Sequence, residues 1–450
     1  MGWRASPTLH KIKQDLSFLK TTFQSEPIHQ GQKTVSNVEV LIDWQGKLIK
    51  LGTMRRIPRA GRESVSFEYS QEWADSKESF PIDPALPIGP GVFYPPNSKE
   101  IFGTIGDSTP DNWGRSLMRR RERRQAEVEE RRPKTLQETD YLLGVSDQTR
   151  LGALRFRWED EEEFQAPLTS GVPGTIELGR LLNASQRIIN GEETDEDLTL
   201  IFAPGSSLGG ARPKASILDQ NNNLSIAKFP KNDDDYSIER WEAIAFELAQ
   251  RSGIRTAAHQ ILHVGGKPIF ITKRFDRKGE IRTPFMSAMA MTQHADREEA
   301  SYLELVDAIS ENGANPKEDR KELFRRVTFS ILVSNTDDHL RNHGFLWMGN
   351  DGWTLSPAYD LNPTPEDKKP RILTTLIDYH EGTCSIELLR SVAEEYSIKL
   401  SDADRIINEV AMATSQWKEV SNKYDAPNSE IRQMSSAFEH HDLDIALGLS

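Results

Sequence analysis

A polar segment that follows an apolar helical pattern constrains the fold of this sequence more than any other feature. Residues 322–333 carry apolar side chains at helical spacing, which predicts a buried helix. The next residues, 334–346, read SNTDDHLRNHGFL, so polar and charged side chains are expected to emerge from that helix into a loop. Polar groups held at such a position require either a capping role or a chemical one.

The spacing of three polar residues indicates a chemical role. Asp337 precedes Asn342 with four residues between them, and an apolar strand at 344–347, a glycine-containing turn, a second strand and Asp360 come after it. Phosphoryl-transfer enzymes use this layout: the first aspartate accepts the proton of the attacking hydroxyl, and the other two residues hold Mg²⁺ against the nucleotide phosphates. Two side-chain oxygens suffice, because Mg²⁺ keeps several waters and also binds phosphate.

Each of these residues taken alone favours a plainer interpretation. Aspartate and asparagine often cap a helix end or shape a turn. The three residues in this order favour phosphoryl transfer, since a cap does not require a matched aspartate after a later strand. The sequence therefore predicts a site for nucleotide and magnesium built on Asp337, Asn342 and Asp360.

A loop rich in small residues lies upstream of this region. Residues 204–214 read PGSSLGGARPK and include Ser206, Ser207, Gly209 and Gly210. Small residues let backbone N–H groups approach phosphate oxygens, which is the physical use of a glycine-rich loop. Glycine and serine also cluster in ordinary loops, so this segment gains its weight from the residues downstream of it.

A lysine and a glutamate complete the pattern. Lys228 lies in an otherwise apolar strand at 224–229, where a charge needs an anionic partner. Glu242 lies at the start of a predicted helix over 241–251, and a strand lysine paired with a helix glutamate near phosphates is the kinase arrangement. An ordinary surface lysine and an ordinary helix glutamate are the alternative. The order of all the parts favours a kinase, so Lys228 and Asp360 are expected to converge on one pocket between two lobes.

Two segments resemble a known family. Residues 336–342 (TDDHLRN) and 356–360 (SPAYD) are similar to the catalytic and metal segments of the HipA family, the serine/threonine kinase toxins of bacterial toxin–antitoxin pairs. Residues 67–73 and 152–156 are similar to strands of the HipA N-terminal domain. The resemblance extends over about 38–440 and is strongest over 207–360.

The resemblance implies a role for each site residue. Asp337 would be the catalytic base, and Asn342 and Asp360 would bind Mg²⁺. Lys228, positioned by Glu242, would hold the phosphates of ATP, and Gly209 and Gly210 would belong to the phosphate loop. Residues 273–277 resemble the hinge that contacts adenine, with Phe275 packing on the base. Family members commonly carry Glu where Lys273 stands, so we expect adenine to be recognised there by the backbone and not by the Lys273 side chain.

Three further residues are assigned with alternatives. His339 either orients the catalytic loop by hydrogen bonding or is a packed histidine, and Asp338 is expected to be solvated rather than catalytic. Ser207 is the site at which the resemblance implies autophosphorylation, with the adjacent Ser206 as the alternative. A phosphate there would repel the phosphates of ATP and expel the loop.

The resemblance also implies partners. A HipB-like helix-turn-helix antitoxin would bind the chain and carry it to operator DNA, and the protein substrate would be a translation component such as an aminoacyl-tRNA synthetase. A small-molecule or lipid kinase is the first alternative, and a silent corepressor that supports an antitoxin on DNA is the second. The N-terminal β segments, and a tyrosine before Asp360 instead of Phe-Gly after it, favour a HipA-type kinase. The retained polar set of Lys228, Asp337, Asn342 and Asp360 speaks against a silent protein.

Length and composition set the remaining limits. A chain of 450 residues is too long for one core, and no segment approaches the roughly 20 apolar residues of a membrane span. The first residues lack an apolar leader, and Cys384 is the single cysteine, which favours a reducing, cytoplasmic location without membrane contact. The net charge of −13 argues against a surface that binds nucleic acid throughout.

These observations predict an α+β, two-lobed, protein-kinase-like fold. The expected parts are an N-terminal extension (1–36), a β-rich subdomain (37–165), a small lobe with the glycine-rich loop (166–290) and a helical large lobe (291–450). Residues 102–118 introduce a helix, with Ser108, Thr109 or Asp111 as candidate caps near Pro110. This helix runs into the basic residues 119–124, which we interpret as a solvated helix face, with a contact to DNA or an acidic partner as the alternative. Other helices are expected at 178–189, 302–309, 317–333, 386–395, 402–418 and 430–438, and strands at 38–42, 47–51, 65–69, 215–218, 259–264 and 268–272.

Overall fold

The computed structural model describes residues 36–59, 62–96, 99–165, 171–202, 210–349 and 352–449. The predicted N-terminal extension lies outside the described residues except for its last position. Ser206, Ser207 and Gly209 of the glycine-rich loop also lie outside the described residues.

The N-terminal part forms a four-stranded antiparallel sheet in the order β3-β2-β1-β4. A tight turn joins β1 to β2, with Gln45 and Gly46 both at positive φ, as two-residue hairpins require. The final strand of the sheet returns from much later in the sequence to pair with β1. The predicted antiparallel unit is therefore present, and its strands are β1 (Ser36–Trp44), β2 (Lys47–Arg59), β3 (Arg62–Tyr69) and β4 (Leu154–Trp158).

Short helices follow the first three strands. Residues 102–118 were predicted to introduce a helix with Ser108, Thr109 or Asp111 as its cap, and they hold α3 (Gly103–Gly106) and the start of α4 (Asn112–Val128), which Asp111 caps. Pro110 lies between them, and a proline disfavours helical backbone in the residue before it. Asp111 then begins α4 by accepting a hydrogen bond from the backbone of Gly114 at 2.7 Å. The flanking helices are α2 (Gln71–Ala74) and α5 (Glu138–Gly144).

The basic run lies on α4 and is exposed or half-buried, as predicted for a helix face. Two of its arginines pair with acidic residues of the same chain. Arg120 lies 2.9 Å from Glu193, and Arg124 lies 3.0 Å from Asp195. These pairs attach α4 to residues 193–195, where two later helices of the chain are joined.

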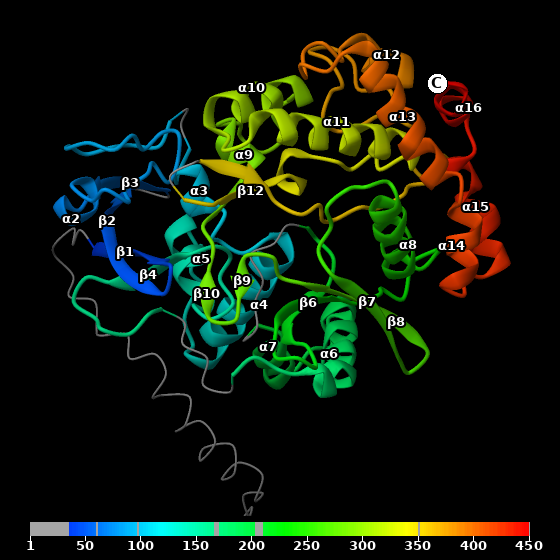
Figure 1. Ribbon diagram of the computed structural model, residues 1–450. Coiled ribbons are helices and arrows are strands. Elements are labelled where there is room, and N and C mark those ends of the chain that lie inside the picture. Colours follow the sequence, from blue (N-terminus) through cyan, green and yellow to red (C-terminus); the bar gives the residue numbers. More distant parts are fainter. Residues whose placement is uncertain are drawn as a thin grey trace, which may run out of the picture. The chain divides into compact units, whose positions relative to one another are not determined.

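A second four-stranded sheet has the order β5-β6-β8-β7, with antiparallel pairs throughout. Side chains alternate between its faces: Ile269 and Ile271 pack with α6 and α7, while Phe270 packs in the cluster that contains α8. The helices therefore cover both faces (Figure 1). The elements are η1 (Thr175–Glu177), α6 (Leu178–Asn190), α7 (Asp195–Phe202), β5 (Lys214–Leu218), β6 (Leu224–Lys228), α8 (Ile238–Arg251), β7 (His259–Val264) and β8 (Lys267–Lys273).

The remaining residues are mostly helical around a small three-stranded sheet in the order β11-β12-β13. The predicted helix at 402–418 is two helices, because the chain turns at Ser415 and Gln416, and the helix predicted to reach 395 ends at Ser391. The elements are β9 (Arg277–Lys278), β10 (Ile281–Arg282), β11 (Phe285–Ser287), α9 (Ala288–Met291), α10 (Tyr302–Asn312), α11 (Pro316–Leu332), η2 (Leu340–Asn342), β12 (Gly344–Trp347), β13 (Trp353–Leu355), α12 (Ile386–Ser391), α13 (Leu400–Thr414), α14 (Trp417–Lys423), α15 (Asn428–Phe438) and α16 (His441–Gly448).

One apolar core connects the N-terminal sheet with the helical part. Phe80, which follows α2, stacks on Trp347 of β12 with ring centroids 4.1 Å apart. Stacked aromatic rings bury large apolar areas, so these two parts of the chain fold against each other. The mixed α+β class predicted from the sequence is confirmed. Within the described ranges, no helix combines the length and apolar character needed to cross a membrane.

Candidate phosphoryl-transfer site

Lys228 is held between two carboxylates at the end of β6. Its Nζ lies 2.6 Å from Glu242 Oε1 and 2.6 Å from Asp360 Oδ1. Strand alternation explains the first contact, since Lys228 pairs with Phe270 in the sheet and faces the side that α8 covers. The second contact joins residues from distant parts of the chain. Lys228 and Asp360 therefore meet at one place, as the sequence predicts.

Burial opposes the charge of Lys228, Glu242 and Asp360, but the resulting pKa of each group differs. Burial opposes the charge on Lys228, but Asp360 and Glu242 raise the pKa of this amine. Burial raises the pKa of Glu242 to about 7, because it outweighs the attraction of the lysine. Burial also opposes ionisation of Asp360, but Lys228 and Lys214 lower the pKa of that carboxyl below its ordinary value. Asp360 is thus the carboxylate of the pair that stays ionised.

The backbone places Asp360 by an unusual conformation. Its φ of 60° lies in the left-handed region, which residues other than glycine rarely adopt and which the surrounding structure must stabilise. The preceding Tyr359 donates from its hydroxyl to the backbone oxygen of Arg341 at 2.6 Å, and Asn362 donates to Asp360 Oδ1 at 3.0 Å. These contacts fix Asp360 beside the loop that follows α11.

That loop carries Asp337 and Asn342. The helix α11 ends at Leu332, and Ser334, with a φ of 54°, turns the chain out of it. The side chain of Asp337 is 74% exposed, whereas Asn342 is 7% exposed and donates from Nδ2 to the backbone oxygen of Asp337 at 3.2 Å. The loop therefore presents one carboxylate to solvent and keeps one amide inside.

Asp338 corrects one expectation. It was predicted to be solvated, but it is buried, because it points back between α10 and α11. Tyr302 donates to Asp338 Oδ2 at 2.6 Å, Ser330 donates at 3.0 Å, and His343 Nε2 lies 3.0 Å from Oδ1. Burial works against its charge, but the pKa of Asp338 is lowered by His343 and these hydrogen bonds. Asp338 anchors the loop from which Asp337 projects.

A pocket lies where these elements meet. Lys228, Glu242, Asn342 and Asp360 line it, and so do the predicted hinge residues Lys273 and Phe275. Of the predicted residues that the structure describes, Gly210, Asp337 and His339 are not among its lining residues. Asp337 and His339 lie on the same loop as Asn342, and Ser206, Ser207 and Gly209 lie outside the described residues. The full lining is Lys214, Ile226, Lys228, Glu242, Phe246, Thr272, Lys273, Arg274, Phe275, Asp276, Asn342, Tyr359 and Asp360.

Lys214 is a lining residue that was not predicted from the sequence. It lies directly opposite Lys228 in the β5–β6 pair, and its Nζ lies 2.7 Å from Asp111 Oδ2, with both side chains almost fully buried. Gly210, the described glycine of the loop, has a φ of 118°, and an added Cβ would lie 3.0 Å from the Lys214 amine. The sequence offered one signal for Lys214: this lysine is the first residue of a strand that pairs with the strand of Lys228.

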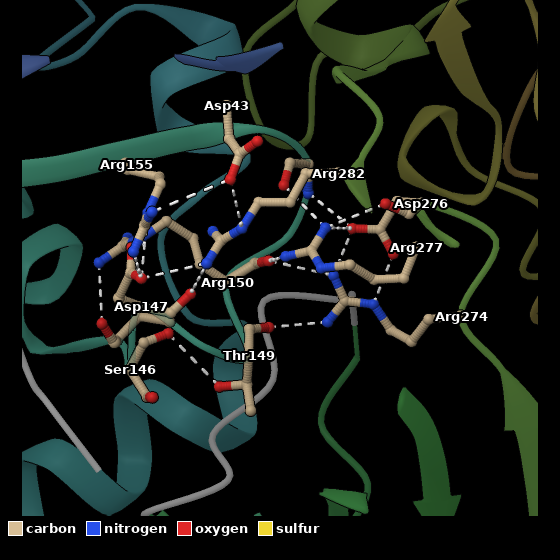
Figure 2. Close-up of polar contacts among 12 residues, drawn as sticks. Asp43, Ser146, Asp147, Thr149, Arg150, Arg155, Arg274, Asp276, Arg277 and Arg282 are labelled. Carbon is tan, nitrogen blue, oxygen red and sulfur yellow. Dashed lines mark hydrogen bonds and ion pairs between the residues drawn. The ribbon is translucent and has the colours of Figure 1, made fainter. Parts of the chain in front are cut away.

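The hinge is clamped by a buried polar network. Asp276 accepts hydrogen bonds from Arg274 Nε at 2.7 Å, from Arg277 at 2.7 Å and from the backbone of Gly152 at 2.8 Å. Arg274 also donates to the backbone oxygen of Thr149 at 2.7 Å. Figure 2 shows that this network extends to Arg150, Arg155, Arg282, Asp43 and Asp147. Thr149 and Gly152, which precede β4, therefore hold the predicted hinge in place.

The hinge backbone is partly used by the sheet. Lys273 donates from its backbone nitrogen to Ala258 at 2.8 Å, and Arg274 donates to Leu224 at 2.9 Å. Lys273 is exposed, and Phe275 lies near Tyr359 with ring centroids 5.5 Å apart. The backbone N–H groups of Lys273 and Arg274 are thus occupied, whereas the backbone N–H of Phe275 makes no hydrogen bond to another described residue.

Two family models match separate parts of the chain. The model of the HipA N-terminal domain matches residues 47–156, and the model of the HipA-like C-terminal domain matches residues 206–417. Together they match more than half of the chain.

Individual proteins agree with these matches. A candidate kinase of Sinorhizobium fredii, Y4mE, is 23% identical over 364 residues, which are 71% of this chain and 76% of that protein. A candidate kinase of Haemophilus influenzae is 32% identical over 211 residues, which are 40% of this chain and 61% of that protein. A chain from the complex of the Shewanella oneidensis toxin–antitoxin proteins HipA and HipB with operator DNA matches with a TM-score of 0.65 at 18% identity. That match covers 91% of this chain and 96% of the other, and it shows the fold.

Proposed function

This chain belongs to the HipA family, and from that premise we propose that it is a kinase that transfers the γ-phosphoryl group of ATP to a serine or threonine hydroxyl of a protein. The observation that carries the proposal is the position of Lys228, bound to both Glu242 and Asp360 at one pocket. The pocket lining includes Lys214 and Lys228, which offer cations for the phosphates, and Ile226, Phe246 and Phe275, which offer apolar surface for the base.

Each side chain of the site has a task in this reaction. Lys228 binds the phosphates, and Glu242 orients the amine. The oxygen of the acceptor hydroxyl forms a bond to the γ-phosphorus, the bond from that phosphorus to the bridging oxygen breaks, and ADP leaves with the electron pair. Asp337 takes the hydroxyl proton, a task that suits an accessible carboxylate at the end of a rigid loop. The hinge binds adenine through the backbone N–H of Phe275.

The chain offers a fitting set of ligands for Mg²⁺. Asp360 stays ionised at the pocket, and Asn342, whose amide nitrogen is bound to Asp337, has its carbonyl oxygen left as a ligand. When bound, the ion supplies positive charge beside the phosphates. The described residues contain no cluster of three or more His, Cys, Asp or Glu side chains suited to a metal.

We also propose that the glycine-rich loop is autophosphorylated on Ser207, or on the adjacent Ser206. Both serines lie outside the described residues, so the support comes from the family and from the neighbouring Gly210 and Lys214. A phosphoserine would carry nearly two negative charges into the phosphate site and disfavour ATP binding. Mass spectrometry after incubation with ATP would locate the phosphate. Its absence from this loop in active enzyme would refute this part of the proposal.

The partners are inferred from the family. The Shewanella oneidensis structure contains HipA with HipB and operator DNA, which supports a HipB-like antitoxin as the partner of this chain and operator DNA as the ligand of the pair. The acceptor protein would be a translation component such as an aminoacyl-tRNA synthetase, reached in the cytoplasm. Blocking that component would stop growth.

The alternatives make different predictions. A small-molecule or lipid kinase would label a low-molecular-weight product, and a silent corepressor would transfer no phosphate. The ion pairs of Lys228 argue against a silent protein. Glu242 is buried, and Lys228 and Asp360 are half-buried, so the three charges cost desolvation that a binding module does not require.

The direct test is to incubate the purified protein with γ-labelled ATP and a bacterial lysate and to identify the labelled species. We expect a labelled protein and its phosphorylated serine or threonine by mass spectrometry. Asp337→Ala should still bind nucleotide but lose label transfer by orders of magnitude. Label confined to lipid or small molecules would support the first alternative, and no label from a nucleotide-binding protein would support the second.

A further inference from the structure

A lysine from another segment lies beside the exposed carboxylate of Asp337. The Nζ of Lys369 is 3.7 Å from Asp337 Oδ1 and donates to the backbone oxygen of Thr336 at 3.2 Å. Lys369 lies beyond Asp360 in the chain, so neither its position in the sequence nor the spacing of the site residues points to it. The contact with two consecutive residues of the catalytic loop places its ammonium at the base proposed above.

The segment that carries Lys369 is docked on the catalytic loop. Thr374 donates to the backbone oxygen of Thr336 twice, from its backbone nitrogen at 3.1 Å and from its hydroxyl at 3.0 Å. The hydroxyl of Thr375 donates to the backbone oxygen of Asp338 at 2.7 Å. Upstream, the backbone of Thr364 donates to Ser334 at 3.1 Å. Bonds on both sides of Lys369 hold it at the loop, so its contact is not that of an unrestrained surface lysine.

The neighbouring lysine of the same segment points elsewhere. Lys368 pairs with Asp235, which precedes α8, and the two side chains are 37% and 62% exposed. The two consecutive lysines therefore have different partners, one in the small lobe and one at the catalytic loop. This difference gives a matched control for any loss of positive charge from this segment.

Physical chemistry gives Lys369 a task. Asp337 is mostly exposed, so an isolated carboxylate would sample several rotamers, and it would also be repelled by the negative phosphoryl group it must approach. An ammonium close to the carboxylate restricts its orientation and offsets that repulsion. When the acceptor oxygen bonds to phosphorus and the hydroxyl proton moves to Asp337, the carboxylate must already face that proton.

We propose that Lys369 is a positioning residue of the phosphoryl-transfer site, which holds the Asp337 carboxylate toward the acceptor hydroxyl and offsets its repulsion from the phosphoryl group. This inference rests on the proposed kinase function and adds a residue to it. Because Lys369 acts on the base, its loss should affect the transfer step and leave nucleotide affinity nearly unchanged.

The test compares Lys369→Gln, Lys369→Arg and Lys368→Gln with the wild-type protein. Label transfer from γ-labelled ATP to a fixed amount of bacterial lysate is measured at increasing ATP, which separates kcat from KM. Lys369→Gln should lower kcat about 10- to 100-fold with the KM for ATP within about threefold of wild type. Lys369→Arg should recover most of the rate, and Lys368→Gln should stay within about twofold of wild type. Thermal unfolding confirms that each variant is folded.

A double variant tests whether Lys369 acts through Asp337. In an Asp337→Asn background, Lys369→Gln should change the residual rate by less than about twofold, because the group it positions is already gone. An additive loss in that background, an equal loss in Lys368→Gln, or a Lys369→Gln variant with native kcat would each overturn the inference while leaving a working kinase. A wild-type protein that transfers no label would overturn the inference and the proposed function together.

Discussion

Replacing Glu242 with glutamine should change how the stability of the protein depends on pH. The carboxyl of Glu242 is buried beside Lys228, and burial raises its pKa from 4.5 to about 7. Below pH 4.5 this group is protonated in both the folded and the unfolded chain, so it adds no pH-dependent penalty. Above pH 7 it is ionised in both states, and the folded state then carries the full cost of the buried charge.

The magnitude is set by the size of that rise. A change from 4.5 to about 7 corresponds to about 3 kcal/mol, at about 1.4 kcal/mol for each pH unit. The wild-type protein should therefore lose about 3 kcal/mol of stability relative to Glu242→Gln as the pH rises from 4.5 through 7. Denaturant unfolding of both proteins at intervals between pH 4.5 and 8 measures this difference, because contributions from distant groups cancel.

Glu247, one turn further along α8, gives a control of opposite sign. Burial acts against its charge, but Lys423 and Arg251 lower the pKa of Glu247. A carboxyl with a lowered pKa stabilises the fold above its unfolded value, and this stabilisation is lost as the pH falls. The wild-type protein should thus gain stability relative to Glu247→Gln as the pH rises through the acid range. Parallel curves for wild type and Glu242→Gln would refute the account of the Lys228 cluster.

Three further perturbations test other parts of the site. Asp276→Asn removes the charge that holds Arg274, and it should raise the KM for ATP more than it lowers kcat in steady-state assays, because the hinge is proposed to contact the nucleotide; an unchanged KM would refute a role for the clamp. Tyr302→Phe leaves Asp338 with one donor fewer, and it should cost about 1–3 kcal/mol in denaturant unfolding; no loss would show that this hydrogen bond does not secure the loop. Lys214→Met leaves Asp111 buried without its lysine and should cost about 3–5 kcal/mol, much of which a second change, Asp111→Asn, should restore; a double variant no more stable than the single one would contradict this pairing.

The sequence predicted the convergence of Lys228, Glu242 and Asp360 because the order of motifs along the chain carries that information. A strand lysine, a helix glutamate and an aspartate after a strand pair each indicate a secondary structure, and together they fit one topology. The antiparallel N-terminal strands were predicted for a related reason, since alternation and turn residues are local signals.

The errors arise where the deciding contact is distant in sequence. Asp338 was expected to be solvated, but one of its hydrogen-bond donors, Tyr302, lies on α10, 36 residues before it in the chain. Lys214 and Asp111 pair across a large sequence separation, as do Lys369 and Asp337. The start of α4 near Pro110 was predicted from a local signal, because a proline marks a helix boundary and aspartate is a favoured cap.

The most direct test of the central claim is calorimetric titration with ATP and Mg²⁺ of the wild-type protein and of Lys228→Gln, both shown to be folded by thermal unfolding. The wild type should bind ATP saturably and only with Mg²⁺, and the affinity should fall about tenfold or more when the ammonium between Glu242 and Asp360 is removed. Equal affinity of the two proteins, or no binding to the wild type, would contradict the claim that this pocket holds the nucleotide.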